Sequence, residues 1–173
     1  MKRKIIKLLA VLICLSLLCS CTGGDIMYIV RNVKDVGQLA DERMEQIVVA
    51  LKEKDKEALK SLFSPKAINE IDNFEKDVDN LFNFFQGAVE TWERDSLSAE
   101  KSIRYGKKSV MIRFGILIST DIDDYSLFII DYNTDTIDPD NEGVYMLEIA
   151  KQSYDGEWES WQDRMMPGIS IVE

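Results

Sequence analysis

The stretch Lys108–Ser119, which reads KSVMIRFGILIS, decides the class of fold. Side chains that repeat with a period of two point to alternate faces of a β-strand. Here one face would carry Val110, Ile112, Phe114, Ile116 and Ile118, and the other would carry Met111, Arg113 and Leu117. A strand with one wholly apolar face has to bury that face against another layer of the protein.

Further strands are predicted on both sides of this one. Gly106-Lys107 is the glycine-first pair of a type II′ turn, which would join Lys108–Ser119 to Lys101–Tyr105 in a hairpin. The other expected strands are Val89–Arg94, Tyr125–Tyr132, Val144–Lys151, Glu157–Trp161 (after a turn at Tyr154-Asp155-Gly156) and Ile169–Val172. Together they predict an antiparallel sheet.

The residues before Gly87 have a helical period instead. Leu39–Leu51 carries apolar residues at helix spacing. Asp55 is expected to cap a second helix, Ser64-Pro65 to start a third, and a longer helix to begin near Asn73. Helices in one half and strands in the other predict an α+β fold with N-terminal helices packed on the sheet.

The N-terminus has the pattern of an export signal. Four of the 21 basic residues lie within Met1–Lys7, and the apolar run Leu8–Leu18 follows. The run is shorter than the about 20 apolar residues that a membrane-spanning helix needs. We therefore expect residues 1–20 to be a signal peptide, with an ordinary cleaved signal as the alternative to the lipoprotein type described next.

Leu18-Cys19-Ser20-Cys21 resembles the lipobox of bacterial lipoproteins. The resemblance implies that Ser20 is the last residue removed and that Cys21 receives the lipid on its sulfur. It predicts a lipidated tether over residues 21–35, a single domain over residues 36–173, and a location at the extracytoplasmic face of the cell membrane. All three cysteines lie in the first 21 positions, so a disulfide framework is excluded.

Two segments carry a second resemblance. Glu57–Pro65 (EALKSLFSP) and Tyr154–Trp158 (YDGEW) are similar to the short second helix and the late hairpin of the nuclear-transport-factor-2-like (cystatin-like) superfamily. With the lipobox, Tyr125–Tyr132 and Asn133–Asp140 also resemble uncharacterised lipoproteins of Gram-positive bacteria. The resemblance implies a cone in which helices pack on a curved antiparallel sheet. Members use the cone for isomerisation, dehydration, ligand binding or partner docking, so it selects no single function.

Composition excludes several functions. The chain of 173 residues has no histidine, which excludes Ser-His-Asp triads and histidine-ligated zinc. Without the leader, 17 basic residues stand against 31 acidic ones, a net charge of −14. Such a body is repelled by phosphate backbones, so nucleic acid is not an expected partner.

Few polar residues interrupt the predicted strands. Asp131 and Glu148 do so, and both are expected on the outward face of the sheet. No convergent acid/base set is visible, so no catalytic residue and no cofactor are predicted. The calcium-loop spacing matches Asp131, Asn133, Asp135 and Glu142, with Asp138 and Asp140 between them, but position 6 is Thr136 instead of glycine. An acidic connection between strands is the alternative, and no metal site is predicted.

Large rings gather in the sheet half. Trp92, Trp158 and Trp161 are expected to pack in the core or to line a pocket. Phe84 does not share the helix face of Phe82 and Phe85, so it would lie under a loop or mark a contact patch.

These patterns predict a membrane-anchored lipoprotein that is not an enzyme and that binds a small apolar or cationic ligand or a partner protein. One alternative is an isomerase- or dehydratase-like enzyme of the same fold. The other is a protein-interaction module whose cone is filled by side chains. An open cavity with a buried Asp or Tyr would favour chemistry, and one without would favour binding.

Overall fold

The computed structural model describes the backbone of residues 25–154 and 165–172, and side chains from Val36 onward. The chain divides into two units, residues 1–36 and 37–173, which are described separately. In the first unit the structure describes the start of helix α2 (Asp25–Glu53), in a segment to which the sequence assigned no element. None of the described helices combines the length and the apolar character that crossing a bilayer requires.

Three helices follow α2, and each begins after a capping residue. They are α3 (Lys56–Leu62), α4 (Pro65–Asn69) and α5 (Phe74–Phe84). The side chains of Asp55, Ser64 and Asn73 each accept a hydrogen bond from a backbone N–H in the first turn. The three predicted helix starts are confirmed. The predicted stop at Gly87 lies three residues beyond the end of α5.

Five strands form one sheet in the order β1-β2-β3-β4-β5. They are β1 (Val89–Arg104), β2 (Lys107–Thr120), β3 (Asp124–Asp135), β4 (Gly143–Lys151) and β5 (Gly168–Val172), with the 3₁₀ turn η1 (Pro139–Asn141) between β3 and β4. The first four strands are antiparallel neighbours, whereas β5 runs parallel to β4 with Gly168 opposite Met146. The prediction of an antiparallel sheet is wrong for this last strand. Residues 152–167 supply the dozen or more residues that a parallel connection needs.

The hairpin between β1 and β2 turns one residue earlier than predicted. Arg104 pairs with Lys107, so the two loop residues are Tyr105 and Gly106. Their φ angles are 51° and 78°. Positive φ at both positions is typical of a type I′ turn, whose twist matches that of the flanking strands. The predicted type II′ turn at Gly106-Lys107 is therefore wrong.

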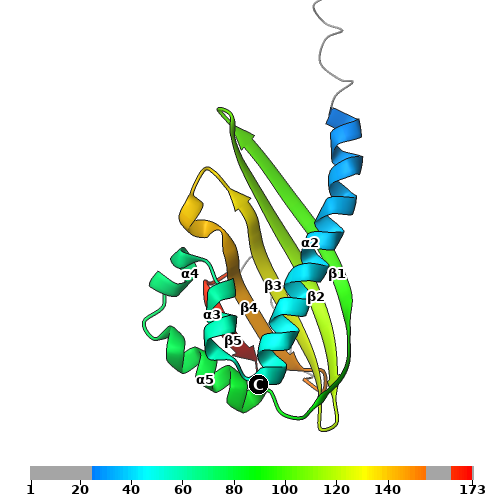
Figure 1. The fold of residues 1–173 in the computed structure, drawn as a ribbon, viewed down its shortest axis with the longest axis vertical. Helices are drawn as coiled ribbons and strands as arrows, with labels where there is room; N and C mark the ends of the chain where they lie inside the picture. The colour runs from blue at the N-terminus through cyan, green and yellow to red at the C-terminus, as the bar shows by residue number, and fades with distance from the viewer. Residues whose placement is uncertain (1–24, 155–164, 173) are drawn as a thin grey trace, which may run out of the picture. The chain divides into compact units, whose positions relative to one another are not determined.

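The helices of the second unit lie against one face of the sheet (Figure 1). The core between the layers contains Met44, Ile47, Val48 and Leu51 of α2, Leu81 and Phe85 at α5, and Ile112, Phe114, Ile116 and Ile118 of β2. The predicted alternation of Lys108–Ser119 is confirmed, because Met111 lies on the opposite face in a second cluster with Ile130 and Met146. The fold of this unit is α+β.

Asp131 and Glu148 are not on an exposed outward face. Each is only 2% exposed. Asp131 pairs with Ile112 and so lies in the row that faces the helices, where the Nε of Arg43 is 3.0 Å from its Oδ1. Glu148 pairs with Phe128 on the other face, which is also covered. The alternation of a strand tells which residues share a face, but not whether that face meets solvent.

Candidate functional site

An open pocket of about 1060 Å³ lies where the end of α5 meets the final residues of β4 and β5. Its lining is Asn80, Asn83, Phe84, Gln86, Lys151, Ser153, Tyr154, Ile171 and Val172. The volume is slightly above the range of roughly 300–1,000 Å³ that is typical of small-molecule sites. We take this pocket as the candidate functional site.

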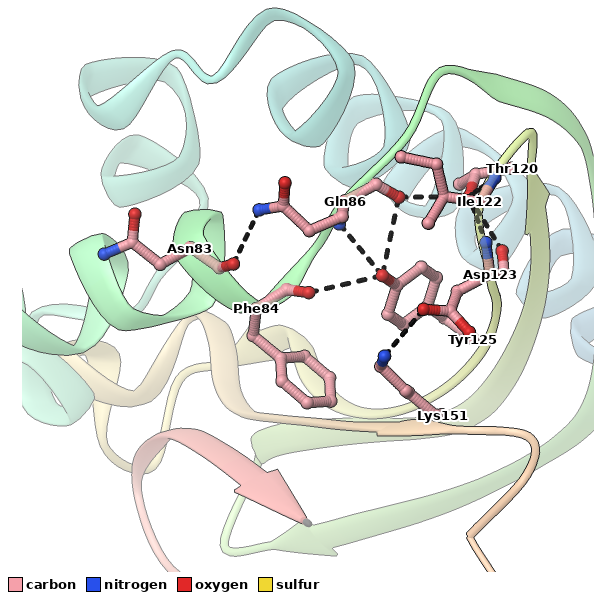
Figure 2. A network of polar contacts seen from close by, with 8 residues as sticks. All are labelled: Asn83, Phe84, Gln86, Thr120, Ile122, Asp123, Tyr125 and Lys151. Carbon is pink, nitrogen blue, oxygen red and sulfur yellow. Dashed lines mark hydrogen bonds and ion pairs between the residues drawn. The ribbon is translucent and has the colours of Figure 1, made fainter.

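Tyr125 of β3 fixes the end of α5 against the sheet. Its buried ring contacts the rings of Phe85 and Phe84, with centroids 4.8 and 5.8 Å away. Its hydroxyl accepts a hydrogen bond from the Gln86 N–H at 2.9 Å and donates to the Phe84 carbonyl at 3.2 Å. Figure 2 shows these backbone groups converging on the hydroxyl. The Tyr125 hydroxyl is thus engaged both as hydrogen-bond donor and as acceptor by backbone groups of residues that line the pocket.

The turn between β2 and β3 supports the same wall from the other side. Thr120 Oγ1 accepts hydrogen bonds from the N–H groups of Ile122 and Asp123 and lies 3.0 Å from the Gln86 carbonyl (Figure 2). The chain passes this hydroxyl at Gly87, where φ is +92° and an added Cβ would lie 2.5 Å from Oγ1. Only glycine therefore lets the segment after α5 approach the turn so closely.

The described lining of the pocket is close to electrically neutral. Among its described lining residues Lys151 is the one with a formal charge, and its Nζ lies 2.6 Å from the Asp123 carboxylate. The same lining contains no Asp or Glu side chain. Its other polar groups are amides and hydroxyls: Asn80, Asn83, Gln86, Ser153 and Tyr154. The protein as a whole carries a net charge of −10, so this neutrality is local.

The residues singled out from the sequence do not gather in one place. Phe84, expected under a loop or in a contact patch, lines the pocket, and so does Tyr154. Trp92 is exposed on β1. Cys21, Trp158 and Trp161 lie outside the described residues, as do most of the turn predicted at Tyr154-Asp155-Gly156 and the strand predicted at Glu157–Trp161.

Most of the polar residues that line the pocket carry no clear signal in the sequence. Asn80 and Asn83 are three residues apart on α5, so they lie on one side of the helix. That spacing is a faint signal, because polar residues at helical spacing usually form a solvated face. Lys151 carries no signal in the sequence, because only the fold brings the end of β4 to the same pocket as the end of α5.

The stretch with calcium-loop spacing is a connection between β3 and β4 whose carboxylates have separate partners. Asp131 pairs with Arg43, Asp138 with Lys66 at 2.9 Å, and Glu142 accepts the Asp135 N–H at 2.8 Å. Within the described residues, no three Asp, Glu or Cys side chains come together as metal ligands do. Asp131 faces α2, where it pairs with Arg43, whereas Asp135 at the end of β3 hydrogen-bonds within the connection that follows.

Asp135 organises this connection instead. Its Oδ1 accepts hydrogen bonds from the N–H groups of Ile137 and Asp138, both at 3.0 Å. Burial acts to raise the pKa of Asp135, but these bonds and those from Asn141 and Ser109 outweigh it, so its pKa is lowered. The carboxylate is held ionised as a turn-forming group.

Comparison with known proteins places the chain in a family. No curated protein matches it. The model of a domain of unknown function (DUF5104) matches residues 46–152, which is more than half of the chain. The match begins within α2, ends at the last residues of β4, and includes Asn83, Gln86 and Lys151 of the pocket. The chain therefore belongs to the DUF5104 family.

Proposed function

We propose that the protein is a lipid-anchored protein of the extracytoplasmic membrane face that binds a small ligand in the pocket between α5 and the ends of β4 and β5. In this proposal residues 1–20 are removed, Cys21 carries the acyl chains, and residues 21–35 connect the anchor to the domain. The pocket itself is the observation that carries the binding function. Its mixed polar and apolar lining is the kind that orients small molecules.

The lining favours binding over catalysis. General acid/base chemistry needs a side chain within hydrogen-bond reach of the substrate and with a suitable pKa. The described lining offers amides, hydroxyls and a paired lysine. The buried phenol nearby, Tyr125, has its hydroxyl engaged by backbone groups.

We further propose that the fold is the cone of the nuclear-transport-factor-2-like superfamily. Three features support this: helices precede the strands, they lie on one face of the sheet, and the first four strands follow one another as antiparallel neighbours. Members of that superfamily have their pocket between the helices and the concave face of the sheet, whereas the pocket described here lies where the end of α5 meets the ends of β4 and β5.

The experiment is native mass spectrometry of the full chain purified from its own host in detergent. The expected result is a retained small molecule in addition to the acyl mass. Ile171→Trp, which fills the pocket, should abolish the additional mass. Ile137→Trp, at an exposed position between β3 and β4, should keep it. No retained mass on the natural chain, or equal retention by both variants, would contradict the proposal.

A further inference from the structure

We infer that the pocket binds an uncharged ligand rich in amide and hydroxyl groups, of the N-acetylated sugar type. This inference rests on the proposed binding function and adds the chemical class of the ligand. The class follows from three properties of the lining: unoccupied amides, an adjacent apolar wall and a neutralised charge.

The amides come from one side of α5 and from the residue that follows it. Asn80 and Asn83 line the pocket as exposed residues, and within the described residues their side-chain amides make no hydrogen bond to the protein, so a ligand would replace water at them. The side-chain amide nitrogen of Gln86 donates a hydrogen bond to the backbone carbonyl of Asn83 at 2.6 Å (Figure 2), and no described donor hydrogen-bonds to its Oε1. The lining therefore presents carbonyl acceptors together with N–H donors. A neutral amide or hydroxyl, which both donates and accepts, matches such a set.

The apolar wall adjoins these amides. It consists of the ring of Phe84 and the aliphatic side chains of Ile171 and Val172. The ring of Phe84 is held edge-on to Tyr125, so its position is fixed before a ligand arrives. A pyranose ring has one face of C–H groups and a rim of hydroxyls. It can therefore contact the apolar wall while its rim reaches the amides.

The charge of the lining argues against an ion. A cationic ligand would be stabilised by a carboxylate, and the described lining has none. An anionic ligand would be attracted by Lys151, but Asp123 already lies 2.6 Å from its Nζ. The net charge of −10 also repels anions from the whole protein. The lining thus favours an uncharged polar ligand over the apolar or cationic one expected from composition.

The test is calorimetric titration of the full lipidated chain in detergent with four probes. They are the disaccharide of N-acetylglucosamine, a glucose disaccharide without acetamido groups, palmitate and spermidine. We expect heat of binding with the first probe, weaker binding with the second, and none with palmitate or spermidine. Asn83→Ala should weaken binding of the first probe roughly three- to tenfold, the effect of one hydrogen bond. Asn69→Ala, an exposed asparagine of α4, should leave it unchanged.

The outcomes separate the ligand class from the binding function. Binding of palmitate or spermidine that is lost in Ile171→Trp would overturn the ligand class and keep the pocket as a binding site. Tight sugar binding that persists in both Asn83→Ala and Ile171→Trp would place the sugar elsewhere and overturn the inference. No binding of any probe, together with no retained ligand in native mass spectrometry, would overturn the inference and the proposed function alike.

Discussion

At the scale of single residues, the buried pair of Arg43 and Asp131 is a stability determinant. A carboxylate that is 2% exposed has lost most of its hydration, and the guanidinium 3.0 Å away replaces part of it. Removing one partner of such a pair costs about 3–5 kcal/mol. We expect Arg43→Met to cost about 3 kcal/mol, the lower end of this range. The Arg43 side chain is 21% exposed, so water can reach the carboxylate once the guanidinium is removed.

Urea unfolding monitored by circular dichroism measures this cost. The double variant Arg43→Met/Asp131→Leu should recover most of the lost stability, because it leaves no buried charge unpaired. Lys60→Met, which removes an exposed pair with Glu75, should shift the unfolding midpoint little. Equal losses in Arg43→Met and Lys60→Met would show that the buried pair has no special role.

Asp131 and Asp135 should give opposite dependences of stability on pH. Burial raises the pKa of Asp131 above its ordinary 3.8, although Arg43 opposes the shift. The folded chain then binds this proton more tightly than the unfolded chain. The free energy of unfolding therefore falls as pH rises from about 3.8 to the folded-state pKa. Asp131→Asn should remove that fall.

For Asp135 the sign is reversed. Its pKa is lowered from 3.8, so its contribution to stability is present above that value and is lost as pH falls toward the folded-state pKa. Asp135→Asn should remove the loss on the acid side only. Unfolding free energies between pH 2.5 and 7 separate the two windows. Identical pH profiles for both variants would refute the assignment.

The Tyr125 hydroxyl should matter for stability through the backbone bonds that it makes. Tyr125→Phe keeps the ring contacts but leaves the Gln86 N–H without its acceptor at 2.9 Å. The bond is partly buried and Gln86 is an exposed residue, so water can replace part of it and its loss costs about 0.5–1.5 kcal/mol. We expect a loss in that range by thermal or urea unfolding. Tyr105→Phe, on the exposed hairpin, should change nothing, and a Tyr125→Phe variant as stable as the natural chain would contradict this role.

At the scale of elements, two glycines with positive φ differ both in backbone strain and in the space around the missing Cβ. Gly106, in the hairpin, has φ of 78° and open space around its missing Cβ. Gly143, at the start of β4, has φ of 122°, and its Cβ would lie 2.9 Å from backbone atoms of Leu62 and Ser64. Gly106→Ala should cost about 1–2 kcal/mol for the left-handed conformation alone.

Gly143→Ala should cost clearly more, because the helices would also have to move away from β4. The same segments are joined by the bridge between Phe63 and Val144 and by the bond from the Ser64 N–H to the Val144 carbonyl at 2.9 Å. Urea unfolding of both variants gives the comparison. Equal costs would mean that the approach of the helices to β4 is loose enough to absorb a methyl group.

Those elements that could be predicted are those whose signal is local. Asp55, Ser64 and Asn73 precede their helices with a side chain that can cap the first turn, and all three caps form. The turn type was mispredicted because a non-glycine residue, Tyr105, adopts positive φ, which its side chain disfavours. The parallel direction of β5 could not be predicted, because alternation within a strand identifies its two faces but not its direction relative to a neighbouring strand.

At the scale of the whole chain, the candidate site depends on topology. Asn83 and Lys151 are far apart in sequence and line one pocket only because the fold brings together the end of α5 and the end of β4. Phe84 was noticed from its position off the helix face, which is a local signal. Asn80 and Asn83 have no such signal, because an asparagine on the polar face of a helix is usually a solvent-exposed residue without a further role.

The proposed membrane anchor depends on four residues, Leu18 to Cys21, and it can be tested independently of the fold. Thioether-linked diacylglycerol with an N-terminal acyl chain would give the two or more hydrocarbon chains that stable anchoring needs, at about 0.8 kcal/mol per buried CH₂. We expect Cys21→Ser to lose incorporation of a fatty-acid analogue in metabolic labelling, to keep residues 1–20, and to lose the acyl mass in whole-protein mass spectrometry.

Cys19→Ser is the matched control, because it removes a neighbouring sulfur and leaves an acceptable small residue before Ser20. It should be labelled and processed like the natural chain, and both should sediment with membranes. Equal labelling of Cys21→Ser and the natural chain would refute the anchor. In that case ligand binding in the pocket would still stand, since it rests on residues 80–172 and not on the N-terminus.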